Sequence, residues 1–200
     1  VIVASASVSA GGATANVAGV LSVVVDKSQA KVDASNSKFT SNELDSYYKA
    51  GNIIIKAVDD STVLNVNVQA AASASGVNVG AAVTANIFNR TVTANADGAI
   101  IKCFNGNVLV SAESADRIVV VGAGASGTSG TAVNGTVLVI VRNNTVKVSA
   151  IGADTYTLIT QEDVKPDYGY IKFTASCSGE LYGIAGSASI SVGSTAVGAT

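Results

Sequence analysis

Residues 51–57 read Gly-Asn-Ile-Ile-Ile-Lys-Ala, and the stretch returns as Gly-Asn-Val-Leu-Val-Ser-Ala at 106–112 and, more loosely, as Gly-Tyr-Ile-Lys-Phe-Thr-Ala at 169–175. The three copies begin 55 and 63 residues apart. Self-similarity at a nearly fixed spacing is typical of repeat proteins, in which each repeat packs on its neighbours. The sequence therefore predicts a repeat architecture.

A second block of sequence repeats in the same order relative to the first. It reads Gln-Ala-Lys-Val-Asp-Ala at 29–34, Thr-Val-Thr-Ala-Asn-Ala at 91–96 and Thr-Val-Lys-Val-Ser-Ala at 145–150, with spacings of 62 and 54 residues. Just upstream, apolar side chains alternate at matching positions. Alternation with a period of two, rich in Val, Ile and Thr, indicates strands, and no segment keeps the 3.6-residue period of a helix. The alternating positions are Leu21/Val23/Val25, Val83/Ala85/Ile87 and Val137/Val139/Val141.

A repeat of this length could form a sandwich, a propeller blade or turns of a parallel β-solenoid. Sandwiches and propellers fill a broad core with large aromatics, whereas aromatics make up 5% of this chain, and Ala, Ser, Gly and Val suit a narrow coil. We therefore predict an all-β fold, a parallel β-helix (β-solenoid) built from 54–63-residue repeats with about two to three coils each. In this fold, like residues stack on like along one interior side. The expected ladders are Ile53/Val108/Ile171 and Val32/Ala94/Val148.

The chain is expected to be one continuous β-solenoid segment, residues 1–200, of a longer protein. Its repeats run approximately over 1–50, 51–105 and 106–168, followed by a partial repeat over 169–200. It begins with Val1 instead of Met and carries no recognisable signal peptide, which favours a mature form or an internal fragment.

Composition disfavours several classes of function. Charged residues make up 13% of the chain and the formal net charge is −2, so no basic field for nucleic acid is expected. The absence of His removes Ser-His-Asp and Cys-His nucleophile pairs and the commonest transition-metal ligand. Three charge-free stretches raise the question of a membrane span, but Ser, Thr, Asn and Gly interrupt them, so no span is expected. They cover residues 1–25, 118–141 and 181–200.

Three local patterns that could carry chemistry fail on context. The GxGxxG at residues 122–127 follows an apolar run, but a poor helix former comes next and no acidic residue lies about 20 residues further on, so nucleotide binding is not expected. Cys103 and Cys177 give no disulfide framework and are expected to be small buried hydrophobes, with a bridge as the alternative. The carboxylates near residues 162–167 define no calcium ligand set. We therefore predict no catalytic, cofactor-binding or metal-binding residues.

The segments after the second block differ in length between repeats and span residues 35–50, 97–105 and 151–168. In repeat folds, insertions gather on one face, which is often the binding face. Here they carry many of the chain's aromatic residues, and Tyr offers a large amphipathic contact area. An alternative role for these rings is to cover the solenoid flank and order their own loops. The candidate surface contact residues are Phe39, Tyr47, Tyr48, Tyr156 and Tyr168.

Residues 60–76, 79–94 and 106–112 together resemble the repeat region of leukotoxin-type filamentous adhesins, large bacterial surface or secreted proteins in the style of filamentous haemagglutinin. The resemblance covers nearly the whole chain, and residues 35–50 and 151–168 depart from it as longer spacers. It implies a secreted β-helical shaft at the cell surface and transfers no catalytic residues.

On this resemblance we expect a non-enzymatic shaft segment of a filamentous adhesin, extracellular or on the bacterial cell surface, with a host or neighbouring-cell surface as its partner. The alternative is a self-assembling extracellular filament subunit that stacks end to end on copies of itself, because open sheet edges can template another chain. A polysaccharide-cleaving β-helix enzyme is disfavoured, because the sequence shows no grouping of Arg90, Arg117 and Arg142 with paired acids.

Overall fold

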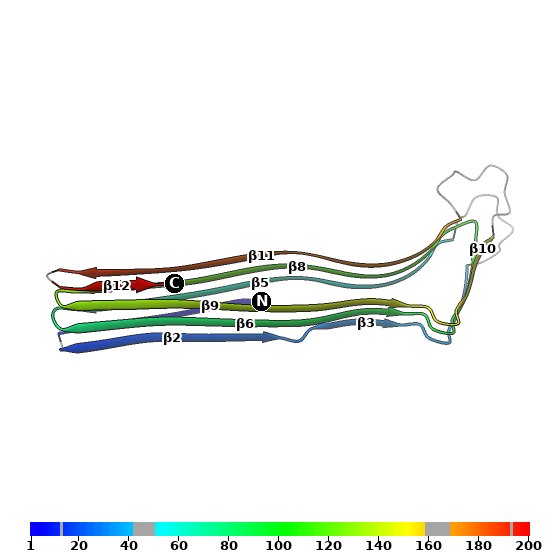
Figure 1. Ribbon diagram of the computed structural model, residues 1–200. Helices are drawn as coiled ribbons and strands as arrows, with labels where there is room; N and C mark the ends of the chain where they lie inside the picture. Colours follow the sequence, from blue (N-terminus) through cyan, green and yellow to red (C-terminus); the bar gives the residue numbers. More distant parts are fainter. Residues whose placement is uncertain (13, 42–50, 159–168, 193) are drawn as a thin grey trace.

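In a computed structural model, parallel strands stack into three sheets (Figure 1). The structure describes residues 1–12, 14–41, 51–158, 169–192 and 194–200, and these contain no helix. The prediction of an all-β parallel β-helix is confirmed.

Sheet A contains β1 (Ile2–Gly11), β5 (Ile53–Ser73), β8 (Val108–Thr128) and β11 (Ile171–Ser191), in that spatial order. Sheet B contains β12 (Ala196–Ala199), β9 (Thr131–Ser149), β6 (Val77–Asn95) and β2 (Ala15–Asp26), with β3 (Gln29–Asp33) also paired to β6. Sheet C contains β10 (Asp154–Leu158), β7 (Ile100–Phe104) and β4 (Lys38–Thr40).

The chain visits the three sheets in a fixed order. From sheet A it turns through residues 74–76 into sheet B, passes residues 96–99 into sheet C, and turns through residues 105–107 into the next strand of sheet A. The long strands of sheets A and B run in opposite directions along the molecule, and sheet C lies at one end (Figure 1). Val, Ile and Thr favour these strands because their branched side chains pack well on a pleated surface.

One sequence repeat forms one coil. Successive repeats are direct neighbours in the sheets, with no coil between them, so both predicted ladders are confirmed and the expectation of two to three coils per repeat is wrong. The reason is strand length: β5 and β8 have 21 residues each and β6 has 19, so a single wide coil uses the whole repeat. The paired residues are Ile53–Val108–Ile171 in sheet A and Val32–Ala94–Val148 in sheet B.

The repeated glycines lie where neighbouring coils come closest. A Cβ atom on Gly106 would lie 2.6 Å from the carbonyl carbon of Gly51, and one on Gly130 would lie 2.7 Å from the carbonyl carbon of Gly76. A side chain does not fit at these distances, and glycine is the residue that lets two backbones approach so closely. Gly106, which opens the second repeat word, and Gly130 therefore mark turns at which one coil rests on the next.

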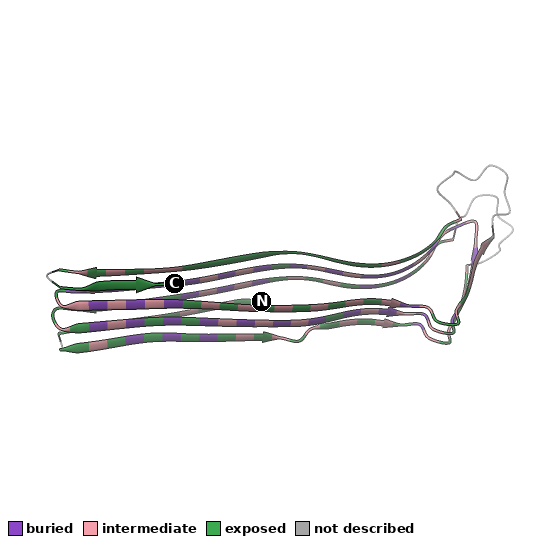
Figure 2. Ribbon diagram, in the orientation of Figure 1, coloured by how far each residue is buried: buried purple, intermediate pink, exposed green. Residues whose placement is uncertain are grey.

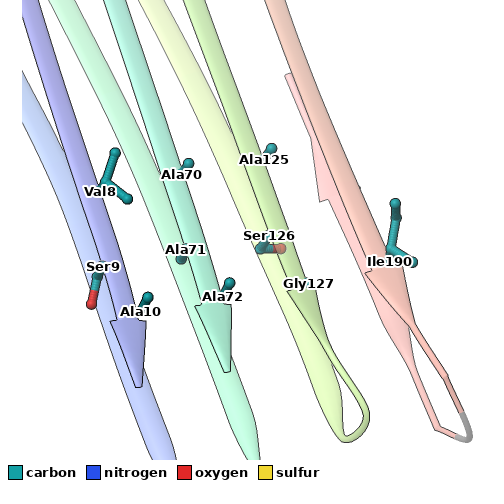
Figure 3. Close-up of a pocket in the computed structure, with 10 residues that line it drawn as sticks. All are labelled: Val8, Ser9, Ala10, Ala70, Ala71, Ala72, Ala125, Ser126, Gly127 and Ile190. Atoms are coloured by element: carbon teal, nitrogen blue, oxygen red, sulfur yellow. The ribbon is translucent and has the colours of Figure 1, made fainter. Parts of the chain in front are cut away.

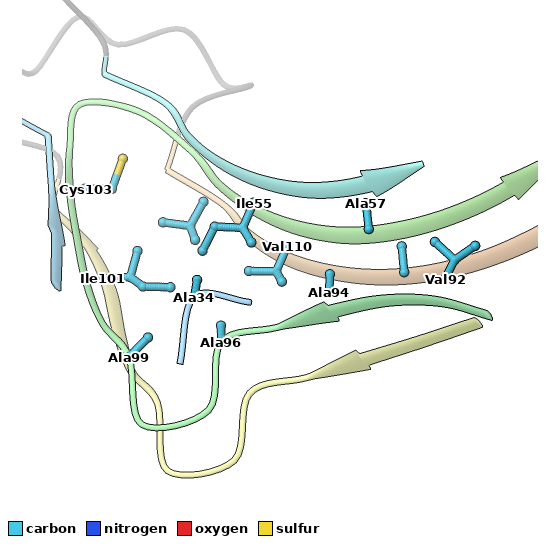
Figure 4. Packing of buried hydrophobic residues seen from close by; sticks show 12 residues of the cluster. Ala34, Ile55, Ala57, Val92, Ala94, Ala96, Ala99, Ile101, Cys103 and Val110 are labelled. Carbon is cyan, nitrogen blue, oxygen red and sulfur yellow. The ribbon is translucent and has the colours of Figure 1, made fainter. Parts of the chain in front are cut away.

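The end of the coil near sheet C, which we call the base, has a conventional apolar core (Figure 4). Its side chains come from all three sheets and include Ile55 and Val110 of sheet A, Val92 of sheet B and Ile101 of sheet C. Each fully buried Val or Ile contributes about 1.5–3 kcal/mol relative to an exposed one. Ala fills the narrow corner between the sheets, at Ala34, Ala94, Ala96 and Ala99.

The other half of the coil, which we call the arm, consists of charge-free sequence. The register aligns the predicted charge-free stretches, because Val63, Ile118 and Leu181 form one ladder and Ile2 pairs with Leu64. Residues 61–89 are a fourth such stretch, absent from the sequence-based prediction, and they occupy the same level of the coil. The arm therefore comprises the described residues of 1–25, 63–87, 118–141 and 181–200.

A buried apolar cluster of Val63, Phe88, Ile118 and Val120 lies where the arm meets the base, and beyond it the interior of the arm is mostly polar and its exterior apolar. Along β5, the inward side chains of Asn65, Asn67 and Gln69 are almost completely buried, whereas Val68 beside them is exposed. The alternation of buried and less buried residues is visible along β6 and β9 (Figure 2). This is the reverse of the usual distribution, in which apolar side chains turn inward. The two long sheets are consequently joined in the arm by side-chain hydrogen bonds.

Candidate functional site

Sheet C places two of the predicted contact residues at the base of the coil. Phe39 of β4 pairs with Ile101, and its partly buried ring packs against the apolar core. Tyr156 of β10 pairs with Lys102, whose ammonium lies 5.4 Å from the ring centroid. Phe39 and Tyr156 therefore lie in one sheet but on opposite faces, because adjacent ladder positions point to opposite sides. Tyr156 belongs to the outer surface, and Phe39 belongs to the core.

The remaining predicted contact residues, Tyr47, Tyr48 and Tyr168, lie outside the described residues. Their segments follow β4 and β10, and both strands pair with β7 in sheet C. Strands that pair in parallel run in the same direction, so their carboxyl ends lie at the same end of the sheet. The two insertions therefore leave the coil at the same end of sheet C.

Two carboxylates stabilise the corner between sheets B and C. The hydroxyl of Ser35 and the ammonium of Lys31 lower the pKa of Asp33 to about 2. Hydrogen bonds from the Ser149 hydroxyl and the Ile151 amide lower the pKa of Asp97. Asp33 accepts from Ser35 two residues further on, which is typical of turn chemistry, whereas Asp97 accepts from donors of the next coil. Among the described residues, no group of three or more Cys, Asp and Glu comes together as a metal site.

A cluster of charges lies between sheets A and B, at the boundary of arm and base. The guanidinium of Arg90, with no exposed side-chain surface, donates to Asp26 Oδ2 at 2.8 Å and lies 3.4 Å from Asp116 Oδ2. Arg142 donates from Nε to Asp116 Oδ2 at 3.0 Å and from Nη2 to Asp116 Oδ1. Asn144 donates to the same Oδ2 at 3.2 Å. Two arginines and two aspartates thus neutralise one another inside the coil.

This cluster corrects an expectation from the sequence. Arg90 and Arg142 do group with paired acids, because they project inward from neighbouring positions of sheet B toward Asp116 of sheet A. Arg117 does not join them; it points outward and pairs with Glu180 at 3.4 Å. Gly179 makes room for the cluster, since a Cβ there would lie 2.8 Å from the carbonyl oxygen of Asp116 and collide with its carboxylate. The carboxylate oxygens accept from arginine and asparagine, an arrangement that joins the two sheets.

Amide side chains join the sheets further along the arm. Asn65 donates to Asn86 Oδ1 at 2.7 Å, and Asn67 donates to Thr84 Oγ1 at 2.6 Å. Asn78 donates to the carbonyl oxygens of two neighbouring strands of sheet A, at 2.7 and 3.0 Å. Buried polar groups need such partners, because an unpaired one costs desolvation energy. Beyond the apolar cluster around Ile118, these bonds take the place of an apolar core in the arm.

The outer faces of the arm expose many large apolar side chains. On sheet B, the outward residues of 15–25, 77–87 and 131–141 include no charged side chain, and Leu21, Val23 and Val139 are among those exposed. The predicted alternating apolar positions all lie on this outer face. Monomeric proteins rarely expose contiguous apolar patches of more than a few hundred Å², so such a surface indicates an interaction site.

The outer face of sheet A differs because small residues hollow it. Ala70, Ala72 and Ala125 form the floor of a groove of about 250 Å³ near the tip of the arm, between Val8 and Ile190 (Figure 3). Nearer the base, this face carries ion pairs such as Lys56–Glu113 at 2.7 Å. Within the arm neither outer face carries a charged side chain, and the sheet A face is distinguished by its groove.

The sequence patterns that could carry chemistry have structural explanations. Residues 122–127 lie within strand β8, so no helix follows the GxGxxG. Cys103 is buried, with its Sγ 2.8 Å from the carbonyl oxygen of Gly51, but Cys177 is exposed and neither forms a disulfide. The expectation of two buried cysteines is thus wrong for Cys177, because β11 lies at the end of sheet A. In the described part of the chain, no helix has the length and hydropathy of a membrane span.

Comparison with known proteins gives no relative to this chain. No family model matches it, and neither a curated protein nor a solved structure is significantly similar. The functional argument therefore depends on the residues and the fold.

Proposed function

We propose that the chain is a structural shaft segment of a secreted or surface filamentous adhesin, located extracellularly or on the bacterial cell surface. The observation that carries this proposal is the one-repeat-per-coil register, which lets a chain of such repeats extend along a single axis. In quasi-one-dimensional folds each coil contacts only its neighbours, so length grows without a new core. A stiff rod of this kind suits a part that projects a contact surface.

The proposed contact surface is the sheet C edge at the base. Tyr156 and Lys102 lie on its outer side, and the insertions of residues 42–50 and 159–168 follow the neighbouring strands β4 and β10. Tyrosine contributes a large contact area at low entropic cost, and loops on a rigid scaffold commonly carry recognition. The partner would be a host or neighbouring-cell surface.

Two measurements test the proposal. Antibodies raised against the 200-residue chain should label intact producing cells or their culture medium. Signal seen only after cell permeabilisation contradicts an extracellular shaft. The purified chain should bind host cells, and Tyr47→Ser, Tyr48→Ser and Tyr156→Ser together should reduce this binding, whereas Thr145→Ser on the sheet B face should not.

A second function, an extracellular filament subunit that stacks end to end, is favoured by the accessible core at the first coil. A cavity of about 420 Å³ between β3, β4 and β5 is lined by Val32, Phe39 and Ile55, side chains that belong to the apolar core or pack against it. Strand edges with adjacent apolar side chains can template another chain. Electron microscopy of the purified chain distinguishes the two functions, because a filament subunit forms long fibres and a shaft segment remains short.

A further inference from the structure

The sheet B face of the arm presents a regular array of branched apolar side chains. We define this B face as the outward residues of 15–25 in β2, 77–87 in β6 and 131–141 in β9. The register aligns them in rows across the strands, for example Leu21–Val83–Val137 and Val23–Ala85–Val139. Most of the large side chains of the B face are exposed to between 37% (Val83) and 73% (Leu21), and Val79, Ile87 and Val133 are half-buried. No described residue therefore shields this apolar part of sheet B from solvent.

We propose that the B face pairs face to face with the B face of a second copy of this chain. This inference goes beyond the shaft function and does not depend on where the protein is located. The pairing is isologous: the same surface is used on both copies, as in most homodimers. The two sheets would pack about 10 Å apart, with the rows of one face between the rows of the other.

The size of the B face is adequate for such a dimer. Three strands about 4.8 Å apart, each contributing eleven residues at about 3.3 Å per residue, give a flat area of roughly 500 Å² per copy. Two copies together would bury about 1,000 Å², without the extra area that protruding side chains add. This value is the lower limit for a specific interface. We therefore expect a dimer of micromolar affinity.

The chemistry of the B face favours a copy of itself over another partner. No charged residue occurs in its three strand segments, so nothing on it selects a charged partner. Its rows repeat every two residues along the strand, a period that the outer face of another β-sheet matches, and a second copy presents such a face with the same rows. Lys31 and Lys147 lie on the same face of sheet B, at the base. If the two copies paired while pointing in the same direction, base against base, these lysines of one copy would face those of the other. An antiparallel overlap of the arms avoids this repulsion.

Two alternatives are less suitable: pairing of two copies through the outer face of sheet A, and binding of the B face to a lipid bilayer. The sheet A face carries a groove of about 250 Å³, which side chains of the opposing copy would have to fill. A lipid bilayer would have to accept the free edge of β2, the last strand of sheet B in the spatial order. Unpaired backbone groups are strongly disfavoured in hydrocarbon, because no water is present to satisfy them. A second copy in water leaves that edge hydrated.

Sedimentation velocity of the full chain tests the proposal, under reducing conditions that prevent disulfides through the exposed Cys177. Val139→Lys places a charge within the B face, on β9. Thr145→Lys is the matched control, because it adds the same charge to the same face of β9, outside the apolar array. Ile184→Lys adds it to the outer face of sheet A. All three positions are on the surface, and circular dichroism verifies that each variant folds.

The wild-type chain should dimerise in the micromolar range, and Val139→Lys should weaken the dimer at least about tenfold, whereas the two controls should not change it. A wild-type chain that stays monomeric up to about 50 µM overturns the proposal. So does a dimer that Val139→Lys leaves intact or that Ile184→Lys dissociates. A further test is flotation of the chain with phosphatidylcholine–phosphatidylglycerol vesicles. If the monomeric wild-type chain floats with the vesicles and Val139→Lys does not, the B face binds a bilayer and the dimer proposal is overturned.

Discussion

Replacing Asp116 by Ala should destabilise the coil strongly. The carboxylate of Asp116 is fully buried and accepts from Arg142 and Asn144, while Arg90 lies 3.4 Å away with no exposed side-chain surface. Its removal leaves two guanidinium groups facing the single carboxylate of Asp26, so one positive charge remains uncompensated between the sheets. Breaking a buried ion pair from one side costs about 3–5 kcal/mol. Because Arg142 is 26% exposed and can regain water, we expect a value near 3 kcal/mol.

Urea unfolding followed by circular dichroism measures this loss, and hydrogen exchange of the β8 and β9 amides locates it. The matched control is Glu113→Ala, which breaks the partly exposed ion pair to Lys56 and should cost less than about 1 kcal/mol. Combining Asp116→Ala with Arg90→Met restores charge balance, so the double variant should lose less than the sum of the single losses. An Asp116→Ala variant within about 1 kcal/mol of the wild type would refute the argument that the cluster compensates buried charge.

Three further predictions concern turns, buried amides and corners. Gly106→Ala should cost about 1–3 kcal/mol in urea unfolding, because its Cβ would collide with the backbone of the preceding coil, whereas Gly135→Ala, with no atom within 4 Å of the added Cβ, should be neutral or stabilising; equal effects would contradict the close-contact explanation. Gln69→Met should stabilise the chain by about 1 kcal/mol, because both polar atoms of the buried amide lack a hydrogen-bond partner among the described residues, and a clear loss of stability would show that the amide is satisfied. Carboxyl NMR titration should give a pKa of about 2 for Asp33, so its stabilising contribution is complete above about pH 4 and is lost as the pH falls through 2; Ser35→Ala should raise this pKa toward 3.8, and an unchanged pKa would rule out the hydroxyl as its main cause.

The repeat words gave reliable information about which residues are neighbours. The Gly-led words, the second block and the alternating apolar positions are all aligned in the sheets as their spacing in the sequence indicated. A parallel in-register stack places equivalent residues side by side, so sequence similarity becomes spatial adjacency. The number of coils per repeat did not follow, because spacing alone does not say whether a repeat forms one wide turn or several narrow ones.

The candidate contact surface was predictable only in part. Variation in insertion length predicted that the insertions gather on one face, and the strands that precede the two long insertions, β4 and β10, both pair with β7. The roles of Phe39 and Tyr156 were not separable in the sequence, since the face to which each points depends on the strand bounds of sheet C. The charge-free residues 61–89 were a usable signal for the arm, because they match the other charge-free stretches in register.

The amino-acid sequence by itself determined that the chain is a repeating stack of parallel strands, because a period-two pattern and recurring words require equivalent residues to pair in register. Only the tertiary structure decided which face of each strand turns inward. In an alternating stretch such as Leu64-Asn65-Val66-Asn67, either set of side chains can be buried, and a one-residue shift exchanges them. Hydrogen bonds between the amides of opposing sheets and the neutralised Arg90–Asp116 cluster stabilise the polar side inside, which leaves valine and leucine on the surface.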